Sequence, residues 1–241
     1  MKRIIALLLL LTMVLTLCFT GCSKIENREG TDKNEAGEST EDTENLTVCE
    51  AGKTAKISIQ IEDNDGNCKV QIPKFESDAK SAAITELNKQ IEDVIVDFYN
   101  TAKSRKNEWP LIATKNFDYE RYLQSVVEYE AFPGIEGSSV ATYVYDKYKD
   151  RYVSLEDAYT LAETTAAKIQ KGVEKARISS ENASINNFEI QGFMFTKSGD
   201  TEFFVKYEYD SGMDAANELM TFIPSTGDLY QTTNDGVYIA E

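Results

Sequence analysis

The apolar residues from residue 56 onward change their spacing several times, and the order of these spacings restricts the fold most strongly. Short stretches with every second residue apolar, the period of a β-strand, come in pairs joined by turn signals. Two longer stretches have apolar residues every three or four positions, the period of a helix. Strands joined by hairpins pair antiparallel, so the sequence predicts an α+β fold in the order ββ-α-ββ-α-βββ. We expect two main helices packed on one side of antiparallel sheet.

The first strand pair is expected at residues 56–61 and 67–73, joined by the turn Asp63-Asn64-Asp65-Gly66. Asp63, Asp65 and Asn67 also resemble the start of a calcium-binding loop. The glycine of such a loop belongs at its sixth position, where Cys68 stands, so the hairpin turn is favoured. A helix is predicted over residues 78–103, with Ser77 or Asp78 as its N-cap.

The second strand pair is predicted at residues 122–132 and 139–145, around a loop that contains Pro133 and Gly134. Ser154 and Asp157 then form a capping-box pattern, which predicts a second helix from this point to about residue 176. Three strands follow, at residues 188–195, 202–209 and 219–223.

The first 22 residues have the pattern of an export signal. Lys2 and Arg3 precede an apolar run of about 14 residues, which is too short to span a bilayer. The run ends before Gly21-Cys22, which resembles the lipobox of bacterial lipoproteins. That resemblance implies a signal peptide over residues 1–21 and a diacylglyceryl group on Cys22. It predicts a chain anchored by lipid to the outer face of the cell membrane.

Residues 22–47 are acidic, polar and almost without apolar side chains, so they are expected to form a disordered linker. Residues 48–241 have globular composition and are predicted to form one extracytoplasmic domain, or two modules over 48–115 and 116–241. Besides Cys22, the exported chain keeps Cys49 and Cys68. Export favours a disulfide between them, and two separate thiols are the alternative.

Composition excludes several classes of function. The chain has no histidine, which excludes histidine-dependent nucleophiles and histidine zinc sites. Without Lys2 and Arg3, 23 of the 25 basic residues stand against 41 acidic ones, for a net charge near −18. Such a surface repels phosphates, so neither nucleic acid nor nucleotide is an expected partner. No cofactor motif or metal motif is present, and neither group is expected.

Carboxylates supply the few candidates for a catalytic site. Glu128 and Glu130 share one face of a predicted strand, and paired carboxylates are the minimum equipment of a glycan hydrolase. Asp118, Glu120 and Asp146 are near them in sequence. A solvated strand face explains the same pattern, and no catalytic residue is assigned.

Two segments resemble the paired extracellular modules of the RsiV-like family of lysozyme-sensing anti-sigma factors. The first covers residues 70–103. It includes Ile72-Pro73 and, in the predicted helix, the sequence Leu87-Asn88-Lys89-Gln90-Ile91. The second covers residues 126–159, from Val126-Val127-Glu128-Tyr129 to Leu155-Glu156-Asp157-Ala158-Tyr159. The resemblance implies a non-catalytic binding or sensing module, with a basic protein or a cell-wall component as its partner. The alternatives are a cell-wall glycan hydrolase and a structural factor of envelope assembly.

Overall fold

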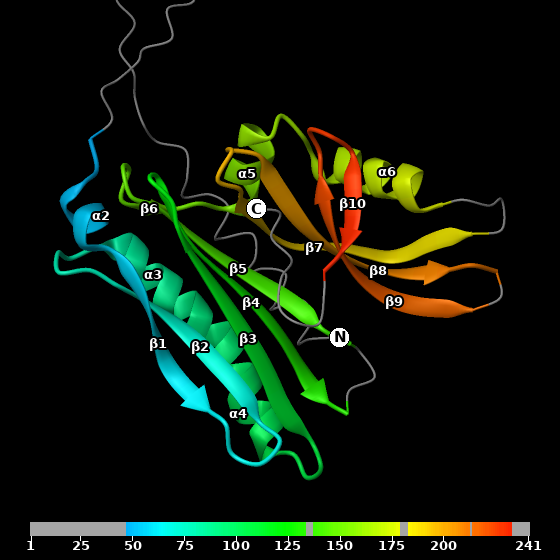
Figure 1. The fold of residues 1–241 in the computed structure, drawn as a ribbon, viewed down its shortest axis with the longest axis horizontal. Coiled ribbons are helices and arrows are strands. Elements are labelled where there is room, and N and C mark those ends of the chain that lie inside the picture. The colour runs from blue at the N-terminus through cyan, green and yellow to red at the C-terminus, as the bar shows by residue number, and fades with distance from the viewer. Residues whose placement is uncertain (1–46, 134–136, 179–182, 213, 233–241) are drawn as a thin grey trace, which may run out of the picture. The chain divides into compact units, whose positions relative to one another are not determined.

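A computed structural model describes residues 47–133, 137–178, 183–212 and 214–232. These residues belong to one unit that spans Glu44–Glu241. They form two β-sheets, each covered by its own helices, and Figure 1 shows both. The predicted signal peptide, the lipidation of Cys22 and nearly all of the predicted linker lie outside the described residues. Among the described residues, no helix is long and apolar enough to cross a bilayer.

The first sheet, sheet A, has six strands in sequence order. All neighbours are antiparallel except β2 and β3, which pair in parallel over a short stretch. The strands are β1 (Lys56–Asp63), β2 (Lys69–Glu76), β3 (Trp109–Asp118), β4 (Tyr122–Phe132), β5 (Ser139–Asp146) and β6 (Arg151–Tyr152). A short helix, α2 (Glu50–Thr54), precedes β1.

One long helical segment connects β2 to β3, because parallel neighbours require a crossover connection. It consists of α3 (Ala82–Ile91), the π-helical turn η1 (Glu92–Val96) and α4 (Asp97–Ser104). The segment lies on one face of sheet A, as Figure 1 shows. Its apolar side chains pack against that face. Buried residues of this layer come from the helix and from four strands: Ile84, Leu87, Ile91, Ile95, Ile72, Ile112, Val127 and Tyr145.

The second sheet, sheet B, has the order β10-β9-β8-β7 and is antiparallel throughout. Its strands are β7 (Ser184–Phe195), β8 (Thr201–Asp210), β9 (Ala215–Ile223) and β10 (Asp228–Gln231). Helices α5 (Leu155–Leu161) and α6 (Ala166–Arg177) pack on one of its faces. Alternate residues of β8 supply this core, namely Phe203, Val205 and Tyr207, as the period-two pattern predicted.

The two sheets meet where β4 and β5 lie against β7. A small apolar cluster of Val126, Val140, Met194 and Phe204 fills part of this junction. Side chains of sheet A also bond to the backbone of β7, because Thr142 accepts from the amide of Phe193 at 3.0 Å. Sheet B therefore covers part of the face of β4 and β5 that lies opposite the long helix.

The α+β class and the antiparallel-rich sheets agree with the sequence analysis, but the predicted arrangement of helices is wrong. The predicted second helix is two helices, because Glu163 takes a positive φ of 49° and Thr165 starts a new helix as its N-cap. The two helical layers cover different sheets rather than one common side. The capping box of Ser154 and Asp157 is confirmed.

Two further differences concern the first half of the domain. The long helix starts later than predicted, with Ser81 rather than Ser77 or Asp78 as the N-cap, since the Ser81 hydroxyl accepts from the amide of Ile84 at 3.0 Å. The sequence analysis missed β3, and the predicted order of elements is therefore wrong. A module boundary between residues 115 and 116 would fall inside β3, whose backbone pairs with β4 on both sides of that point.

Candidate functional site

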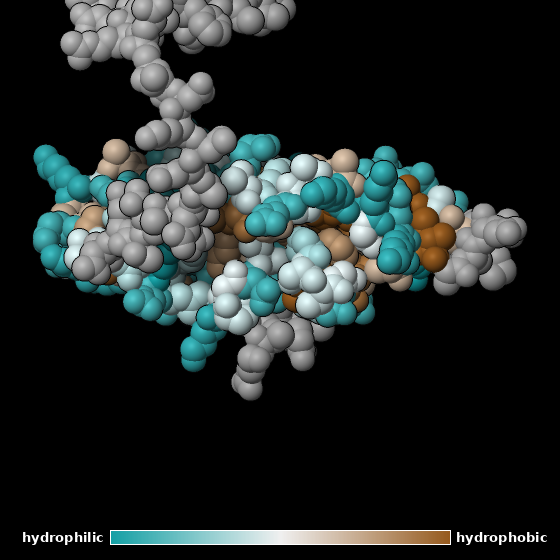
Figure 2. All heavy atoms as spheres, turned by 90° about the horizontal axis from the view of Figure 1, so that it is seen from above, coloured by the Kyte–Doolittle hydropathy of each residue, from teal (hydrophilic) through white to brown (hydrophobic). Residues whose placement is uncertain are grey.

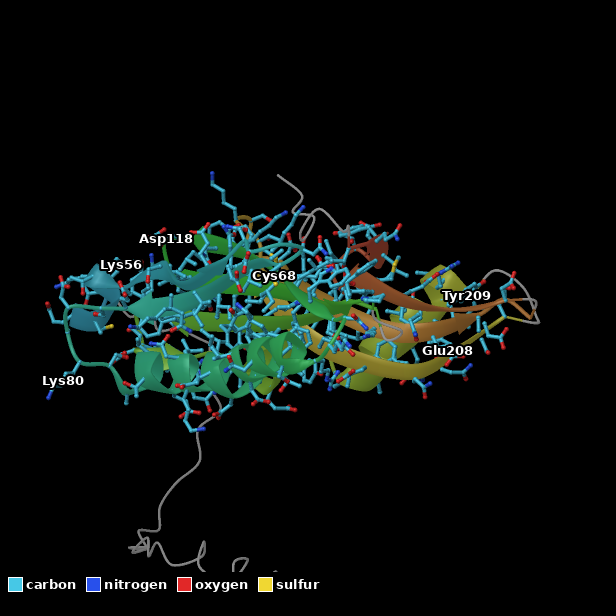
Figure 3. All side chains as sticks on the ribbon, turned by 90° about the horizontal axis from the view of Figure 1, so that it is seen from below. Lys56, Cys68, Lys80, Asp118, Glu208 and Tyr209 are labelled. Carbon is cyan, nitrogen blue, oxygen red and sulfur yellow. The ribbon has the colours of Figure 1, made fainter. Side chains whose placement is uncertain are left out.

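The two cysteines that were expected to form a disulfide are both free thiols. The Cys49 thiol caps α2 by accepting from the amide of Gly52 at 3.2 Å, and Ser77 bonds to α2 at 2.9 Å near the end of β2. Cys68 instead follows the turn at the other end of the β1–β2 hairpin, away from Lys56 at the start of β1, as the labels in Figure 3 show. The hairpin therefore separates the thiols by a strand length of roughly 25 Å, far beyond disulfide reach.

Asp118 ends β3 and Glu120 lies in the β3–β4 turn, while Asp146 ends β5 opposite Tyr122. All three acids act as structural groups. Asp146 is fully buried, and Arg121 donates to its Oδ2 at 2.9 and 3.1 Å. Its Oδ1 accepts the backbone amides of Tyr148 and Lys149. Both oxygens of the carboxylate are thereby satisfied, which is typical of a turn-stabilising aspartate.

The other two acids, Asp118 and Glu120, have partners as well. Asp118 pairs with Lys147 at 2.7 Å, and Glu120 accepts from the Tyr148 hydroxyl at 3.1 Å. Tyr122, opposite Asp146, is six residues from Glu128 along β4, or roughly 20 Å. The structure does not bring these three acids to Glu128 and Glu130.

Glu128 and Glu130 do lie together, on one face of β4, and both line a cleft between the two sheets. We call it the inter-sheet cleft, and its volume is about 790 Å³. Strand β4 contributes Glu128 and Glu130, and Ser138 comes from just before β5. Sheet B and α6 contribute the opposite side, including Lys206, Leu219, Asn217, Glu218, Arg177 and Thr232. A smaller hollow of about 480 Å³ adjoins the same two glutamates over β2 and β3.

Glu128 has an unusual environment for a carboxylate. Its side chain is only 7 % exposed, and no hydrogen-bond donor among the described residues reaches its Oε2. Burial raises the pKa of Glu128, and the charge of Glu130 adds to the increase. The Ser138 hydroxyl and the charge of Lys115 lower the same pKa without offsetting burial.

The pKa of Glu128 responds to Ser138, Glu130 and Lys115, and Lys206 lines the same cleft. The Ser138 hydroxyl donates to Glu130 Oε2 at 3.0 Å. Lys206, from β8, lines the cleft and donates to the Ser139 hydroxyl at 3.1 Å. The salt bridges within the described part of the chain do not include Lys206. The site thus places two carboxylates, a hydroxyl and an ammonium around one water-accessible space.

A second acid in the cleft, Glu218, provides a direct contrast. Arg177 bonds to both of its oxygens, at 2.6 and 2.9 Å, and stacks on the Tyr209 ring at 3.7 Å. The bond to Arg177 lowers the pKa of Glu218. One cleft therefore holds a fully paired carboxylate and one that lacks a partner at Oε2, and the second is the candidate for ligand contact.

The sequence reasoning found Glu128 and Glu130 from their spacing but missed the rest of the site. Lys206 and Glu218 are about 80–90 positions further along the chain, and no local pattern connects them to β4. The part of the chain that the structure describes contains no cluster of three or more cysteine, aspartate or glutamate side chains arranged to hold a metal ion.

The face shown in Figure 2 is mostly hydrophilic in the described part, and hydrophobic residues appear there only in small separate areas. On this face the described residues form no broad apolar patch, and the polar inter-sheet cleft is taken as the candidate for recognition. Comparison with known proteins finds no family model that matches the chain, and no match among curated proteins.

Proposed function

We propose that this chain is a lipid-anchored, extracytoplasmic binding and sensing module without catalytic activity, and that the inter-sheet cleft is its ligand site. The lipobox-like Gly21-Cys22 sequence after an apolar leader supports the location. The resemblance of residues 70–103 and 126–159 to the RsiV-like family supports a sensing role. The partner is a basic protein or a cell-wall component, reached from the membrane through the linker.

The observation that carries the proposal is the buried, unpartnered Oε2 of Glu128, a residue that lines a cleft of about 790 Å³. Removing a carboxylate from water without a hydrogen-bond partner destabilises a fold. Asp146 and Glu218, also buried or half-buried, both have full sets of partners. Glu202 is buried without a hydrogen-bond partner among the described residues as well, but it does not line the cleft. A group that the fold leaves unsatisfied at the wall of a cleft is suited to contact a ligand.

Photo-crosslinking on intact cells tests this proposal. A photoreactive amino acid replaces Asn217, an exposed neutral residue that lines the cleft. We expect an adduct with an envelope component that mass spectrometry identifies, and we expect Glu128→Gln to abolish it. The same photoreactive residue at Thr85, on α3 across sheet A from the cleft, is the control.

Adducts of equal yield from Asn217 and Thr85, or an Asn217 adduct that Glu128→Gln leaves unchanged, would contradict the assignment of the cleft. The location is tested separately with Cys22→Ala. That variant should lose its fatty acid and leave the membrane fraction, because a diacyl anchor supplies the membrane affinity.

One observation favours a second candidate, a cell-wall glycan hydrolase. A buried acid with a raised pKa beside another carboxylate is the equipment of a general acid in glycoside hydrolysis. No aromatic residue of the described chain lines the cleft to stack on a sugar ring, and we therefore rank this function second. Release of reducing ends from peptidoglycan by the purified chain, lost in Glu128→Gln, would favour the hydrolase over the binding module.

A further inference from the structure

Glu128, Glu130 and Ser138 all line the inter-sheet cleft, and the Ser138 hydroxyl already bonds to Glu130. We propose that the three side chains form a subsite for an ammonium group. The inference rests on the proposed function, since it assigns a ligand chemistry to the same cleft. The ammonium belongs to a small amine or to a lysine side chain of a larger partner, and the two sources share this chemistry.

The first step concerns the charge of the ligand. Glu128 Oε2 accepts no bond from the described residues. The Glu130 carboxylate acts on Glu128 as a like charge, and the charge of Lys115 acts in the opposite sense. Glu218 and Asp228 also line the cleft, and Arg177 is already bound to Glu218. A cation between Glu128 and Glu130 removes their mutual repulsion and supplies the missing donor, whereas a neutral donor supplies only the bond.

The second step concerns the size of the cation. Alternate residues of a strand have Cα atoms about 6.6 Å apart and side chains on one face. If one nitrogen donates to two carboxylates at about 2.8 Å each, the two accepting oxygens lie up to about 5.6 Å apart, which is close to that Cα spacing. An ammonium has three donors, and Glu128, Glu130 and the Ser138 hydroxyl offer three acceptors.

The third step excludes two other cations. A guanidinium is bound best by both oxygens of one carboxylate, as Arg177 is by Glu218. At Glu128 a single oxygen, Oε2, is buried without a partner, which suits a compact point charge. A divalent metal ion requires more oxygen ligands than this subsite provides, and the described residues contain no cluster of three metal-binding side chains.

Lys206 is the one resident ammonium that lines the cleft within the described residues. Its Nζ bonds to the Ser139 hydroxyl rather than to either glutamate. In the proposed complex the Lys206 ammonium stays bonded to the Ser139 hydroxyl, and its positive charge repels the ammonium of the ligand. Lys206→Met should therefore strengthen binding of a free ammonium two- to fivefold, as expected for loss of a partly screened like charge.

The test uses the full chain, acylated and held in detergent micelles, with n-butylammonium as the probe and ligand-observed NMR as the readout. We expect n-butylammonium to bind and n-butanol, its neutral analogue of similar size, to show no binding. Glu128→Gln should weaken n-butylammonium binding at least tenfold, and Ser138→Ala should weaken it less. Glu86→Gln removes the same charge from exposed α3 and should change affinity less than twofold.

Equal binding of n-butanol, or equal effects of Glu128→Gln and Glu86→Gln, would overturn the ammonium subsite. A blocked Gly-Lys-Gly peptide that binds more tightly than n-butylammonium identifies a lysine side chain as the source. The reverse order identifies a small amine.

The two proposals fail in different ways. If a Glu128-dependent crosslink forms on cells but n-butylammonium does not bind, the ligand chemistry is wrong and the cleft assignment stands. If n-butylammonium binds through Glu128 but no crosslink depends on Glu128, the subsite stands and the partner-binding function is wrong.

Discussion

Gln124 and Phe195 bond to each other as two neighbouring strands would. Gln124 Nε2 donates to the Phe195 carbonyl at 2.9 Å, and its Oε1 accepts from the Phe195 amide at 2.8 Å. Gln124 lies on β4 of sheet A and is fully buried, while Phe195 ends β7 of sheet B. One side chain thus continues the hydrogen bonding of sheet B into sheet A.

Gln124→Leu should destabilise the domain by about 2–4 kcal/mol. Leucine has a similar volume but leaves the amide and the carbonyl of Phe195 buried without partners, and each such group costs about 1–3 kcal/mol. Urea unfolding followed by circular dichroism measures the change. Gln60→Leu, at an exposed position of β1, should change the unfolding free energy by less than about 0.5 kcal/mol. A loss at Gln124 no greater than at Gln60 would refute the role of this bond.

Glu202 predicts a dependence of stability on pH. This residue of β8 is fully buried, neither of its oxygens has a hydrogen-bond partner among the described residues, and it lies on the same face as Phe204. Burial raises the pKa of Glu202 to about 7, with a further increase from the charge of Asp200. Burial raises the pKa of nearby Tyr119, and the charge of Glu202 adds to that increase.

The folded chain therefore favours protonated Glu202, while the unfolded chain ionises it near pH 4.5. This contribution to stability is fully present below pH 4.5, falls as the pH rises, and is lost above pH 7, a change of about 3 kcal/mol. Glu202→Gln should remove this dependence. Unfolding free energies of both proteins between pH 4.5 and 8 check it, with Glu86→Gln as control. Parallel curves for wild type and Glu202→Gln would contradict the prediction.

Ammonium binding at Glu128 should also depend on pH, in the opposite direction. The subsite carries its full charge only when Glu128 is ionised, and burial raises the pKa of this group. Affinity for n-butylammonium should therefore fall as the pH is lowered through the raised pKa, by up to tenfold per unit below it. NMR titrations from pH 5 to 8 measure the slope. In Glu128→Gln the slope should vanish, and a slope kept in that variant would assign it to another group.

Gly192 permits the close approach of β7 to β5. A Cβ atom at this position would lie 2.5 Å from Thr142 Oγ1 and 2.7 Å from its Cγ2. Gly192→Ala should cost about 1–3 kcal/mol, because the junction is packed and also contains the bond from Phe193 N to Thr142.

A double-mutant cycle separates the clash from other effects of Gly192→Ala. Thr142→Ala removes the atoms that the new methyl group of the Gly192→Ala variant would contact. Thr142→Ala should therefore lower the unfolding free energy less in the Gly192→Ala variant than in the wild type. The coupling measured by urea unfolding should exceed 0.5 kcal/mol. If the changes in unfolding free energy of the two single variants simply add in the double variant, the clash with Thr142 is relieved by movement elsewhere.

The sequence predicts elements whose signals are local. The limits of β4 agree with the predicted strand, and Ser154 with Asp157 marks the start of α5 because a capping box involves only four residues. β3 lacks such a signal, since Pro110, Lys115 and Asn116 interrupt its apolar alternation. It is a strand because β2 and β4 lie on both sides of it.

For the candidate site as well, the sequence predicts what depends on neighbouring residues and not what depends on contacts between distant segments. The spacing of Glu128 and Glu130 places them on one strand face, but their spacing says nothing about which face meets sheet B. Asp146 is also a carboxylate and lies near this pair in sequence, yet Arg121 and two amides satisfy it. Only contacts between distant segments distinguish a carboxylate that stabilises a turn from one that borders a cleft.

Each sheet has its own helices and its own apolar core, and side chains such as Gln124 and Thr142 make much of the connection between them. During evolution, mutations can therefore alter one half without changing the strand register of the other, provided that these few joining residues persist. Among divergent copies of such a chain, the angle between the halves, and with it the width of the cleft, can change faster than either core.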